Sequence, residues 1–509
     1  MRVWIAAAAV ALAIPAVASA GTVFLLEGRG WGHGVGMSQW GAEGYARNGY
    51  DDRRILAHYY PETHIGIAQP REVRVLLVQS QPAIRIGSTA PFLVVDARGR
   101  KLHLPARAVV VDKRFMLQHI RLAKPLRFVA GAEPLEVDLA AYRGDVVVKA
   151  KPEGLMAVNV LPLDRYLRGV VPREAPKGWH EETYEAQAVA ARSYTLATVH
   201  PGEDFDVFPD DRSQMYGGVA AERTETNLAI GATAGQVLVW RDRIVAAYYF
   251  SSSGGRTSSV HDAWPRAHQV PYLVSVSDPY DYLSPHHVWP TQVLSSAKVS
   301  SILGVAGVLD IQVLHNSSGR ARAVRVLTAH GWRVVPGAAV RTKFHLGSMD
   351  FDLHAMELDD PGRALYGKTV HVTGFVRGLG RARLQELTEA GWITVRHVHV
   401  TPAGRFDVAL RAVRTTEFRL AYNGLAGEPV GLQVAPQVVV TADGSRLRVR
   451  VFPALPLQVE RLTNRQWRSV ASARGVFDRT LRPGSYRVTV RGSSRYTGEI
   501  SAPVAVRPA

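Results

Sequence analysis

The sequence predicts an α+β protein, in which a mixed β-rich region with a few helices is followed by two β-sandwich-like modules. Short apolar runs such as FLVVD, AVVVD and DVVVKA, all between residues 66 and 162, are typical of strands. Residues 181–197 (EETYEAQAVAARSYTLA) contain good helix formers and neither proline nor glycine. From residue 367 onward, apolar and polar residues alternate between turn residues, which is typical of antiparallel sandwich strands.

The length and composition set limits on the function. A chain of 509 residues exceeds one ordinary core and predicts two to four domains. The 47% hydrophobic and 21% charged residues exclude a disordered or membrane-embedded chain as a general description. The absence of cysteine excludes disulfides, cysteine nucleophiles and thiolate zinc sites. A net charge of +17 favours polyanionic partners.

Residues 1–20 have the pattern of a secretory signal peptide. A basic head precedes an apolar run that ends in Ala18, Ser19 and Ala20, and we expect cleavage after Ala20. The alternative is a membrane anchor, but the run is shorter than the roughly 20 residues that span a bilayer. We therefore expect a secreted protein of the cell envelope that contacts the membrane only transiently, during export. Export argues against nucleic acid and favours an anionic wall or surface polymer.

The mature chain divides into five predicted regions. Residues 21–65 are rich in glycine and aromatics and then become helical, and residues 66–162 form a β-rich subdomain. Residues 163–355 mix helices with strands and form the expected chemical centre. Two sandwich-like modules follow, at 367–436 and 437–509.

A weak repeat links the two modules. LQELTEAGWITV, which begins at Leu384, returns as VERLTNRQWRSV from Val459. Because Trp392 and Trp467 occupy equivalent places, we expect them to fill the module cores; the alternative is that they are sugar platforms.

Glu174 is the candidate general acid. The sequence predicts that it lies in a proline-flanked loop between an apolar strand and the helix at 181–197. A carboxyl group beside Val170, Val171, Pro172 and Trp179 would be partly desolvated, which raises its pKa as a general acid requires. Taken alone the signal is weak, because most glutamates near a helix start are solvated or act as caps.

Several long motifs carry a family resemblance. GRGWGHGVGMSQWGAEGYARNGY at Gly28, GVVPREAP at Gly169, SQMYGG at Ser213, YYFSSSGG at Tyr248 and PYLVSVSDPYD at Pro271 together resemble the stage II sporulation protein D family, which includes the amidase enhancer LytB. The resemblance covers about residues 28–351. It implies a lytic transglycosylase that acts on peptidoglycan, notably on glycan without stem peptides, and leaves 1,6-anhydro-N-acetylmuramic acid ends. It also implies that Glu174 is the single acid and base.

The chain departs from the family pattern in two ways. Ala175 stands where the family usually has methionine after the glutamate, which changes the packing and leaves the acid. In the family the GHGVGMSQ motif lies near the C-terminus, whereas here it opens the mature chain. The order is therefore predicted to be circularly permuted, with residues 28–65 packed against 163–351 to complete the cleft.

Further polar residues in these motifs are predicted to contact the substrate. Each has a structural alternative: a hydrogen-bonded histidine, glycines that allow tight packing, turn hydrogen bonds, or a serine-rich turn. Of the helix residues Arg192 and Tyr194, which lie on different faces, Arg192 is the better candidate. The predicted contacts are His33, Gln39, Arg192, Gln214, Tyr216, Ser251, Ser252 and Ser253.

Other function classes are weaker or remain open. The serines lack the G-x-S-x-G elbow of a serine hydrolase. Adjacent His286 and His287 would point to opposite faces of a strand, and the cysteines that bind metal in some family members are missing, so we expect neither metal nor cofactor. A non-catalytic role stays open, in which the protein binds peptidoglycan glycan strands and assists a wall amidase.

Overall fold

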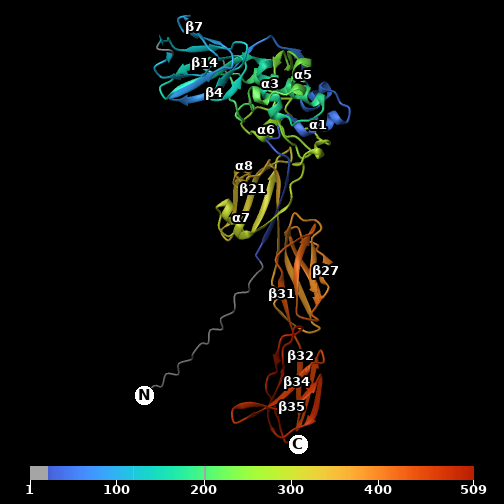
Figure 1. The fold of residues 1–509 in the computed structure, drawn as a ribbon. Helices are drawn as coiled ribbons and strands as arrows, with labels where there is room; N and C mark the ends of the chain where they lie inside the picture. Colours follow the sequence, from blue (N-terminus) through green and yellow to red (C-terminus); the bar gives the residue numbers. More distant parts are fainter. Residues whose placement is uncertain (1–20, 118–119, 200–201, 509) are drawn as a thin grey trace, which may run out of the picture.

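The computed structural model describes residues 21–117, 120–199 and 202–508, so the predicted signal peptide lies outside the described residues. Figure 1 shows an elongated molecule, with a β-rich subdomain beside a helical lobe at one end, then a small α/β unit and two β modules. The predicted β-rich α+β fold is confirmed. None of the helices in the described part of the chain combines the length and apolar character needed to cross a bilayer.

The β-rich subdomain is built from two sheets around one apolar core. The larger has the order β4-β15-β14-β11-β6-β7, and the smaller has the order β13-β12-β5-β8. The strands of entry and exit, β4 and β15, are neighbours, so the subdomain leaves the lobe and returns at the same place. Its strands are β4 (Glu72–Gln81), β5 (Ala83–Gly87), β6 (Phe92–Asp96), β7 (Lys101–Leu104), β8 (Val109–Asp112), β9 (Met116–Leu117), β10 (Ile120–Arg121), β11 (Leu126–Val129), β12 (Leu135–Val137), β13 (Ala140–Tyr142), β14 (Asp145–Ala150) and β15 (Leu155–Pro162).

The helical lobe is organised around helix α4 (Glu181–Thr198), which confirms the helix predicted at 181–197. The alanines of α4 are buried on several sides, because short side chains let α1, α2, α3 and α5 approach it closely. The other elements are α1 (Gln39–Arg47), α2 (Asp52–Tyr59), α3 (Leu163–Glu174), α5 (Thr224–Ala232), α6 (Val260–Ala263), the 3-10 turns η1 (Val219–Ala221) and η2 (Asp281–Leu283), the pair β2 (Met37–Ser38) and β18 (Tyr249–Phe250), and a sheet of β3 (His64–Ile67), β16 (Gln236–Trp240) and β17 (Arg243–Ile244).

The predicted strand and loop before Glu174 are wrong: this segment is helix α3, and Glu174 is its last residue. The buried residues Leu163, Tyr166, Leu167, Val170 and Val171 recur with helical spacing. Pro172 lies in the last turn, where the helix is about to end and a missing N–H costs little. The apolar stripe therefore decides the structure, and the proline only marks its end.

The N-terminal segment supplies an inner strand of a sheet in the middle of the molecule. Strand β1 (Val23–Arg29) lies between β19 (Gln292–Ser295) and β23 (Asp350–Leu358) in a five-stranded sheet of order β19-β1-β23-β25-β28. Its side chains alternate between two cores, with Phe24 in that of the small α/β unit and Leu25 in that of the first sandwich. The α/β unit adds α7 (Ser296–Leu303), β20 (Asp310–His315), β21 (Ala321–Thr328), β22 (Gly331–Pro336) and α8 (Gly337–Phe344).

The first β module extends beyond the predicted limits of 367–436. Its core includes Val23, Leu25, Met356 and Leu358 from β1 and β23, which face a second sheet of order β24-β31-β29-β26-β27. The module is therefore a sandwich that shares strands with the preceding unit. Its own strands are β24 (Arg363–Leu365), β25 (Thr369–Arg377), β26 (Arg383–Thr388), β27 (Gly391–His397), β28 (Arg405–Arg411), β29 (Thr416–Tyr422), β30 (Leu425–Ala426) and β31 (Val430–Ala435).

The second β module begins with β32 at Gln437. Its strands form one sheet, and residues from both halves of that sheet meet in a single core, so the sheet folds over on itself. The strands are β32 (Gln437–Asp443), β33 (Arg446–Phe452), β34 (Pro456–Thr463), β35 (Gln466–Arg474), β36 (Val476–Thr480), β37 (Gly484–Val490), β38 (Glu499–Ile500) and β39 (Val504–Val506).

The predicted repeat forms equivalent hairpins, but the expectation that its tryptophans fill the cores is wrong. Trp392 and Trp467 are half-buried, and each ring lies beneath an arginine, with Arg419 at 4.2 Å and Arg487 at 4.6 Å from the ring centroids. The hairpin β21–β22 is a third copy, VRVLTAHGWRVV from Val324, with Arg325 4.6 Å from the Trp332 ring. In all three, the tryptophan pairs with a leucine across the hairpin. The arginine therefore covers the aromatic face that a core would otherwise cover.

We predict that the N-terminal strand is essential for stability. Leu25→Ala is expected to lower the free energy of unfolding by about 2–5 kcal/mol, because the side chain is fully buried and its loss leaves a cavity. Urea-induced unfolding measures the effect. Val293→Ala is the matched control: Val293 pairs with Leu25 in β19 but is 45% exposed. Equal losses for the two variants would contradict the shared-core arrangement.

Candidate active site

Glu174 is held at the C-terminal end of α3 beside the SQMYGG segment. Its Oε1 accepts a hydrogen bond of 2.9 Å from the Met215 N–H, and the side chain is half-buried. Gly169 on the same helix allows this approach, since a Cβ there would lie 2.5 Å from the Tyr216 ring. The carboxyl is thus fixed by backbone and is still open in part to solvent.

The environment raises the pKa of Glu174 above its ordinary value of 4.5. Burial is the main cause, and the hydrogen bonds from Met215 and Gln39 and the charge of Arg173 oppose it. The C-terminal end of a helix also disfavours negative charge. The group is therefore suited to hold a proton at a higher pH than a solvated glutamate.

The N-terminal segment reaches this carboxyl through Gln39, the first residue of α1. Its side chain hydrogen-bonds Glu174, and its Nε2 donates to Gln187 Oε1 of α4 at 3.3 Å. Helices α1 and α2 share an apolar core with α4 and with Val245, Ala247 and Leu273. The predicted packing of residues 28–65 against 163–351 is confirmed; the circular permutation itself stays a prediction.

Tyrosine side chains surround Glu174 on its other sides. The charge of Glu174 raises the pKa of Tyr166, Tyr194 and Tyr249 in addition to the effect of their burial. On α4 it is therefore Tyr194, and not Arg192, that lies toward the acid. The two-residue offset places Arg192 and Tyr194 on different faces of α4, and the prediction that Arg192 faces the acid is wrong.

Three predicted contacts lie in buried hydrogen-bond networks. Arg192 is 1% exposed and donates to Asp164 Oδ1 at 2.9 Å and to the carbonyls of Gln236 and Ile230. Gln214 donates to Thr195 Oγ1 at 2.7 Å and accepts from Tyr249, and the Tyr216 hydroxyl donates to Asn159 at 2.8 Å. These positions favour the structural alternative for all three side chains.

The serine loop is anchored to a buried pair of aspartates. Ser252 Oγ donates to Asp281 at 2.9 Å and Ser253 Oγ donates to Asp278 at 2.7 Å, so both hydroxyls are occupied. Burial and the charge of Asp281 raise the pKa of Asp278 to about 7. Ser251 remains half-buried, and its carbonyl accepts from the Trp40 N–H. Ser252 and Ser253 therefore position the loop.

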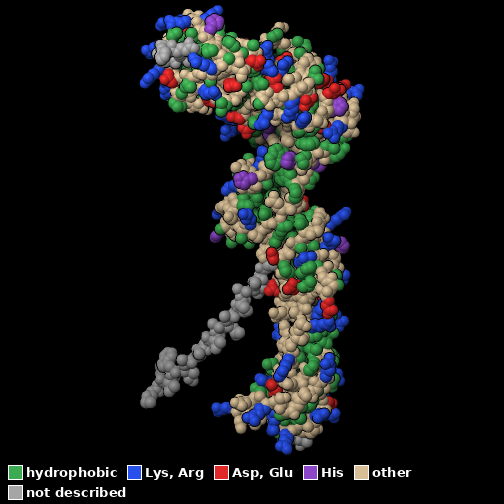
Figure 2. All heavy atoms as spheres, in the orientation of Figure 1, with side chains coloured by type: hydrophobic (Ala, Val, Ile, Leu, Met, Phe, Trp, Pro, Cys, Tyr) green, Lys and Arg blue, Asp and Glu red, His purple; other side chains and the backbone are tan. Residues whose placement is uncertain are grey.

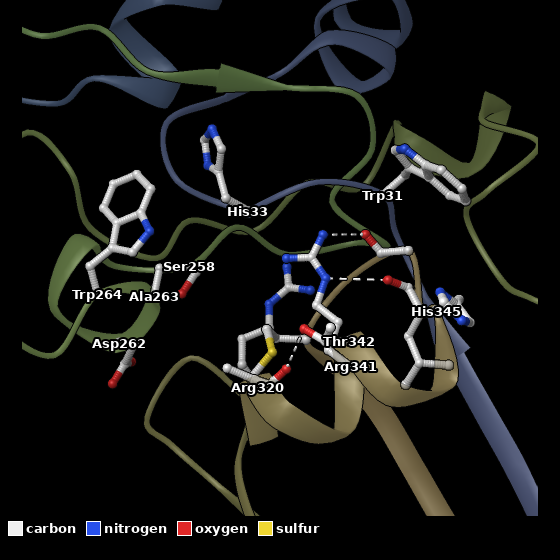
Figure 3. A pocket seen from close by; sticks show the side chains of 14 residues that line it. Trp31, His33, Ser258, Asp262, Ala263, Trp264, Arg320, Arg341, Thr342 and His345 are labelled. Carbon is white, nitrogen blue, oxygen red and sulfur yellow. Dashed lines mark hydrogen bonds between the residues drawn. The ribbon is translucent and has the colours of Figure 1, made fainter. Parts of the chain in front are cut away.

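His33 lies at a cavity of about 630 Å³ whose lining does not include Glu174 (Figure 3). The Nδ1 of His33 accepts from the Val35 N–H at 3.0 Å, and the ring also hydrogen-bonds the Tyr249 backbone. Burial lowers the pKa of His33 to about 4, so the ring is neutral at physiological pH. The rings of Tyr248 and Tyr194 connect this cavity with the surroundings of Glu174.

The groups that could hold a metal lie away from these residues. Asp52, Glu182 and Glu185 bring carboxylate oxygens within 4.8 Å of one another, at the contact of α2 with α4. Of the two adjacent histidines, His287 bonds Asp281 at 2.9 Å and His286 packs against Trp31. The histidines therefore do not act as a pair.

The surroundings of Glu174 coincide with a known domain. Residues 151–240, which include α3, α4 and the SQMYGG segment, match the family described as SpoIID, stage II sporulation protein. The chain carries a SpoIID-family domain. The match supports the predicted resemblance over these residues, which contain both Glu174 and its Met215 partner.

Relatives with curated descriptions extend the SpoIID similarity. Stage II sporulation protein D of Bacillus subtilis is 28% identical over 271 residues, which are 48% of this chain and 75% of that protein. The amidase enhancer of B. subtilis is 36% identical over 116 residues, which are 23% of this chain and 15% of that protein. A solved titin fragment, A168–A169, covers 30% of this chain and 96% of its own, with 12% identity and a TM-score of 0.18, a likeness too low to bear on the fold.

We predict a pH-dependent stability difference between the wild type and Glu174→Gln. Below about pH 4.5 the carboxyl is protonated in both the folded and the unfolded chain. As pH rises through the window between 4.5 and the raised pKa, the unfolded chain releases the proton first, so the wild type loses stability. The glutamine of the variant cannot ionise, so the free energy of unfolding of the variant increases relative to that of the wild type over this pH window. Urea unfolding at a series of pH values measures the difference; a difference independent of pH would contradict the raised pKa.

Proposed function

We propose that this chain is a cell-envelope lytic transglycosylase that cleaves the glycan strands of peptidoglycan and leaves 1,6-anhydro-N-acetylmuramic acid ends. The observation that carries the proposal is the half-buried carboxyl of Glu174, whose pKa is raised by burial while backbone and amide groups fix its position. The SpoIID similarity and the predicted export support it.

One carboxyl is sufficient for this reaction. In the first step protonated Glu174 gives its proton to the glycosidic oxygen while the bond from that oxygen to C1 breaks. In the second, the Glu174 carboxylate removes the proton of the 6-hydroxyl on the same muramic acid, and O6 bonds to C1. The carboxyl ends protonated, as it began. Because the nucleophile belongs to the substrate, the step profits from intramolecular effective molarity.

Residues around Glu174 fit the two protonation states that the cycle needs. Met215 N–H and Gln39 donate to the charged form, while burial favours the neutral one, so neither state is strongly excluded. The ring centroids of Trp40 and Trp179 lie 5.0 Å apart, and both rings belong to the apolar cluster that includes Ala175, the residue after Glu174. They form an aromatic wall. Such a wall suits the apolar face of a sugar ring.

A non-catalytic enhancer of a wall amidase is the second candidate function. The similarity to the B. subtilis amidase enhancer favours it, with 36% identity over 116 residues. In that case Glu174 would serve stability or recognition and no glycosidic bond would break. The two functions differ in their products.

A cationic cavity supports a polyanionic partner for either function. It has a volume of about 530 Å³ in the β-rich subdomain, where the loops after β6, β8 and β10 meet. Its only acidic lining residue, Asp96, accepts hydrogen bonds from the backbone N–H groups of Arg98, Arg100 and Ala123. None of its cationic side chains makes an ion pair within the described residues. They are Arg98, Arg100, Lys113, Arg114, Arg121 and Lys124.

We predict that Glu174→Gln abolishes cleavage of denuded glycan strands. Loss of the acid is expected to lower the rate by about 10²–10⁴-fold. The purified chain is incubated with the strands, and mass spectrometry counts the anhydro-muramic ends. Glu181→Gln, an exposed glutamate on α4, is the matched control and should retain activity. An inactive wild type would favour the enhancer, and an equally active variant would remove Glu174 from the mechanism.

We predict that the cationic cavity strengthens binding to cell walls. Replacing Arg98 and Arg114 with glutamine is expected to weaken sedimentation with purified walls about tenfold at low ionic strength, and less at high salt, because the attraction is screened. The double variant of Arg322 and Arg333 removes the same charge from exposed sites elsewhere. If the two double variants weaken sedimentation with walls equally, the cavity contributes no more to binding than the overall positive charge of the protein does.

A further inference from the structure

The cavity beside His33 lies between two parts of the molecule that are distant in sequence. One wall comes from Trp31 and His33 of the N-terminal segment and from Trp264, which follows α6. The opposite wall comes from α8 and the residues after it, with Arg341, His345 and Met349 (Figure 3). The cavity is therefore separate from the carboxyl of Glu174, although His33 and Gln39 belong to the same short segment.

The guanidinium groups of Arg320 and Arg341 both line this cavity, and only that of Arg320 makes an ion pair within the described residues. Arg341 donates to the carbonyls of Leu346 at 3.2 Å and Gly347 at 3.0 Å, and it has no ion pair within the described residues. Burial lowers the pKa of Arg320, and the charges of Arg29 and Arg341 add to this effect, while those of Asp350 and Asp281 oppose it. An anion between the two guanidinium groups would relieve their repulsion.

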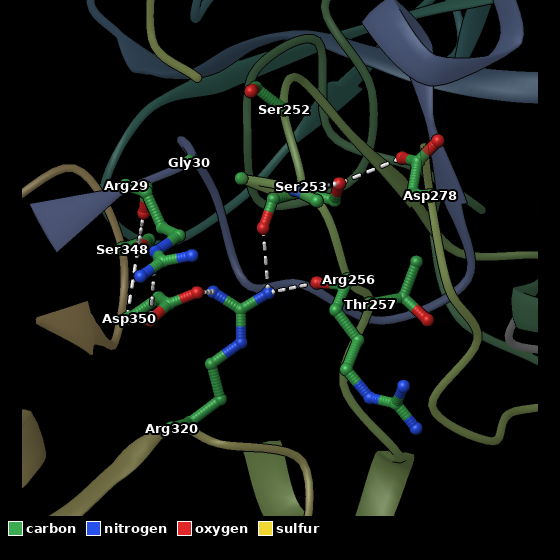
Figure 4. Close-up of polar contacts among 12 residues, drawn as sticks. Arg29, Gly30, Ser252, Ser253, Arg256, Thr257, Asp278, Arg320, Ser348 and Asp350 are labelled. Carbon is green, nitrogen blue, oxygen red and sulfur yellow. Dashed lines mark hydrogen bonds and ion pairs between the residues drawn. The ribbon is translucent and has the colours of Figure 1, made fainter. Parts of the chain in front are cut away.

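Arg320 has one donor without a hydrogen-bond partner among the residues that the structure describes. Its side chain is 4% exposed; one terminal nitrogen donates to the carbonyls of Ser253 and Arg256, and the other lies 3.4 Å from Asp350 (Figure 4). Its Nε is buried and has no hydrogen-bond partner. A buried, unpaired donor on a charged group costs free energy unless a ligand or water satisfies it.

The nearby carboxylates are already engaged. Asp350 is shared between Arg320 and Arg29, whose Nε lies 3.8 Å away. Asp262 also lines the cavity, but its Oδ2 accepts three hydrogen bonds, from Ser317 Oγ and from the N–H and Oγ of Ser318. His33 is neutral. Burial opposes the ionisation of Asp262, but hydrogen bonds from Ser318, Ser317 and Ser259 lower its pKa, so this lining residue keeps its negative charge. Arg341 is the lining arginine that has no ion pair within the described residues.

Aromatic rings lie on either side of the cations. Trp31 is 49% exposed and packs against His286 at 4.6 Å, and Trp264 packs against His33 at 5.2 Å and Tyr248 at 5.0 Å. Aromatic faces cover the apolar faces of sugar rings, and a guanidinium binds a carboxylate through paired hydrogen bonds. The combination selects a sugar that carries a carboxylate.

We propose that this cavity is a subsite for a carboxylate-bearing sugar of the glycan strand, with Arg341 as donor to the carboxylate and Trp31 and Trp264 as contacts for the ring. The inference rests on the proposed function, because N-acetylmuramic acid is the peptidoglycan sugar that carries such a group, on its lactyl ether. Arg341 then determines specificity without taking part in bond cleavage.

The test is equilibrium binding in the Glu174→Gln chain, so that turnover plays no part. Titration followed by NMR compares N-acetylmuramic acid with N-acetylglucosamine, which lacks the lactyl group, and with the neutral methyl ester of N-acetylmuramic acid. We expect the free acid to bind about tenfold or more tightly than either neutral sugar. Arg341→Gln should abolish this preference and leave the weak binding of N-acetylglucosamine unchanged.

Controls separate the subsite from folding and from catalysis. Arg333→Gln removes an exposed arginine of the same unit and should change nothing. Equal affinities for the acid and its ester, an unchanged preference in Arg341→Gln, or tighter binding of inorganic phosphate than of the acid would each overturn the proposal. If the preference holds while the wild type forms no anhydro ends, the subsite stands and the proposed cleavage fails.

Discussion

The placement of the N-terminal segment is the constraint on which the rest of the structure depends. Strand β1 contributes to two cores, and the residues after it must run close under the loop at 248–255 before α1 begins. A Cβ at Gly36 would lie 2.0 Å from the Tyr248 carbonyl, and its φ is +75°, so no other residue fits. At Gly41 a Cβ would lie 2.1 Å from the Tyr59 hydroxyl. The glycines of the motif thus serve close packing, which delivers Gln39 to Glu174.

Some polar groups contact the carboxyl of Glu174 directly, and others hold the surrounding segments together. Gln39 and the Met215 N–H contact the carboxyl itself. Behind them, buried hydrogen bonds of Gln214 and Tyr216 join the SQMYGG segment to α4 and β15, and those of Arg192 join α4 to α3. Asp278 and Asp281 do the same for the serine loop. Buried networks of this kind hold a few groups in one geometry because leaving any member unpaired is costly.

The sequence was sufficient for features that depend on local pattern. The helix at 181–197, the strands between residues 66 and 162 and the two related hairpins follow from composition and alternation. The helix that ends at Glu174 is also encoded, in the spacing of Leu163, Tyr166, Leu167, Val170 and Val171, although Pro172 by itself is more typical of a loop. The cavity beside His33 had no local signal, because α8 and Trp31 lie some 300 residues apart and only tertiary packing brings them together. For the same reason, burial of Ser252 and Ser253 could not be foreseen from a serine-rich turn.

The order of pairing in the five-stranded sheet has a consequence for how the chain acquires its structure. During synthesis β1 emerges first, yet both of its neighbours, β19 and β23, are made more than 260 residues later. Closing so long a loop slows assembly, since its entropy must be lost before the new contacts compensate. The β-rich subdomain, whose first and last strands adjoin, can complete itself in the meantime. The core that holds α1 against α4 has Leu273 as its last buried residue, so Gln39 can reach Glu174 before the sheet around β1 is complete.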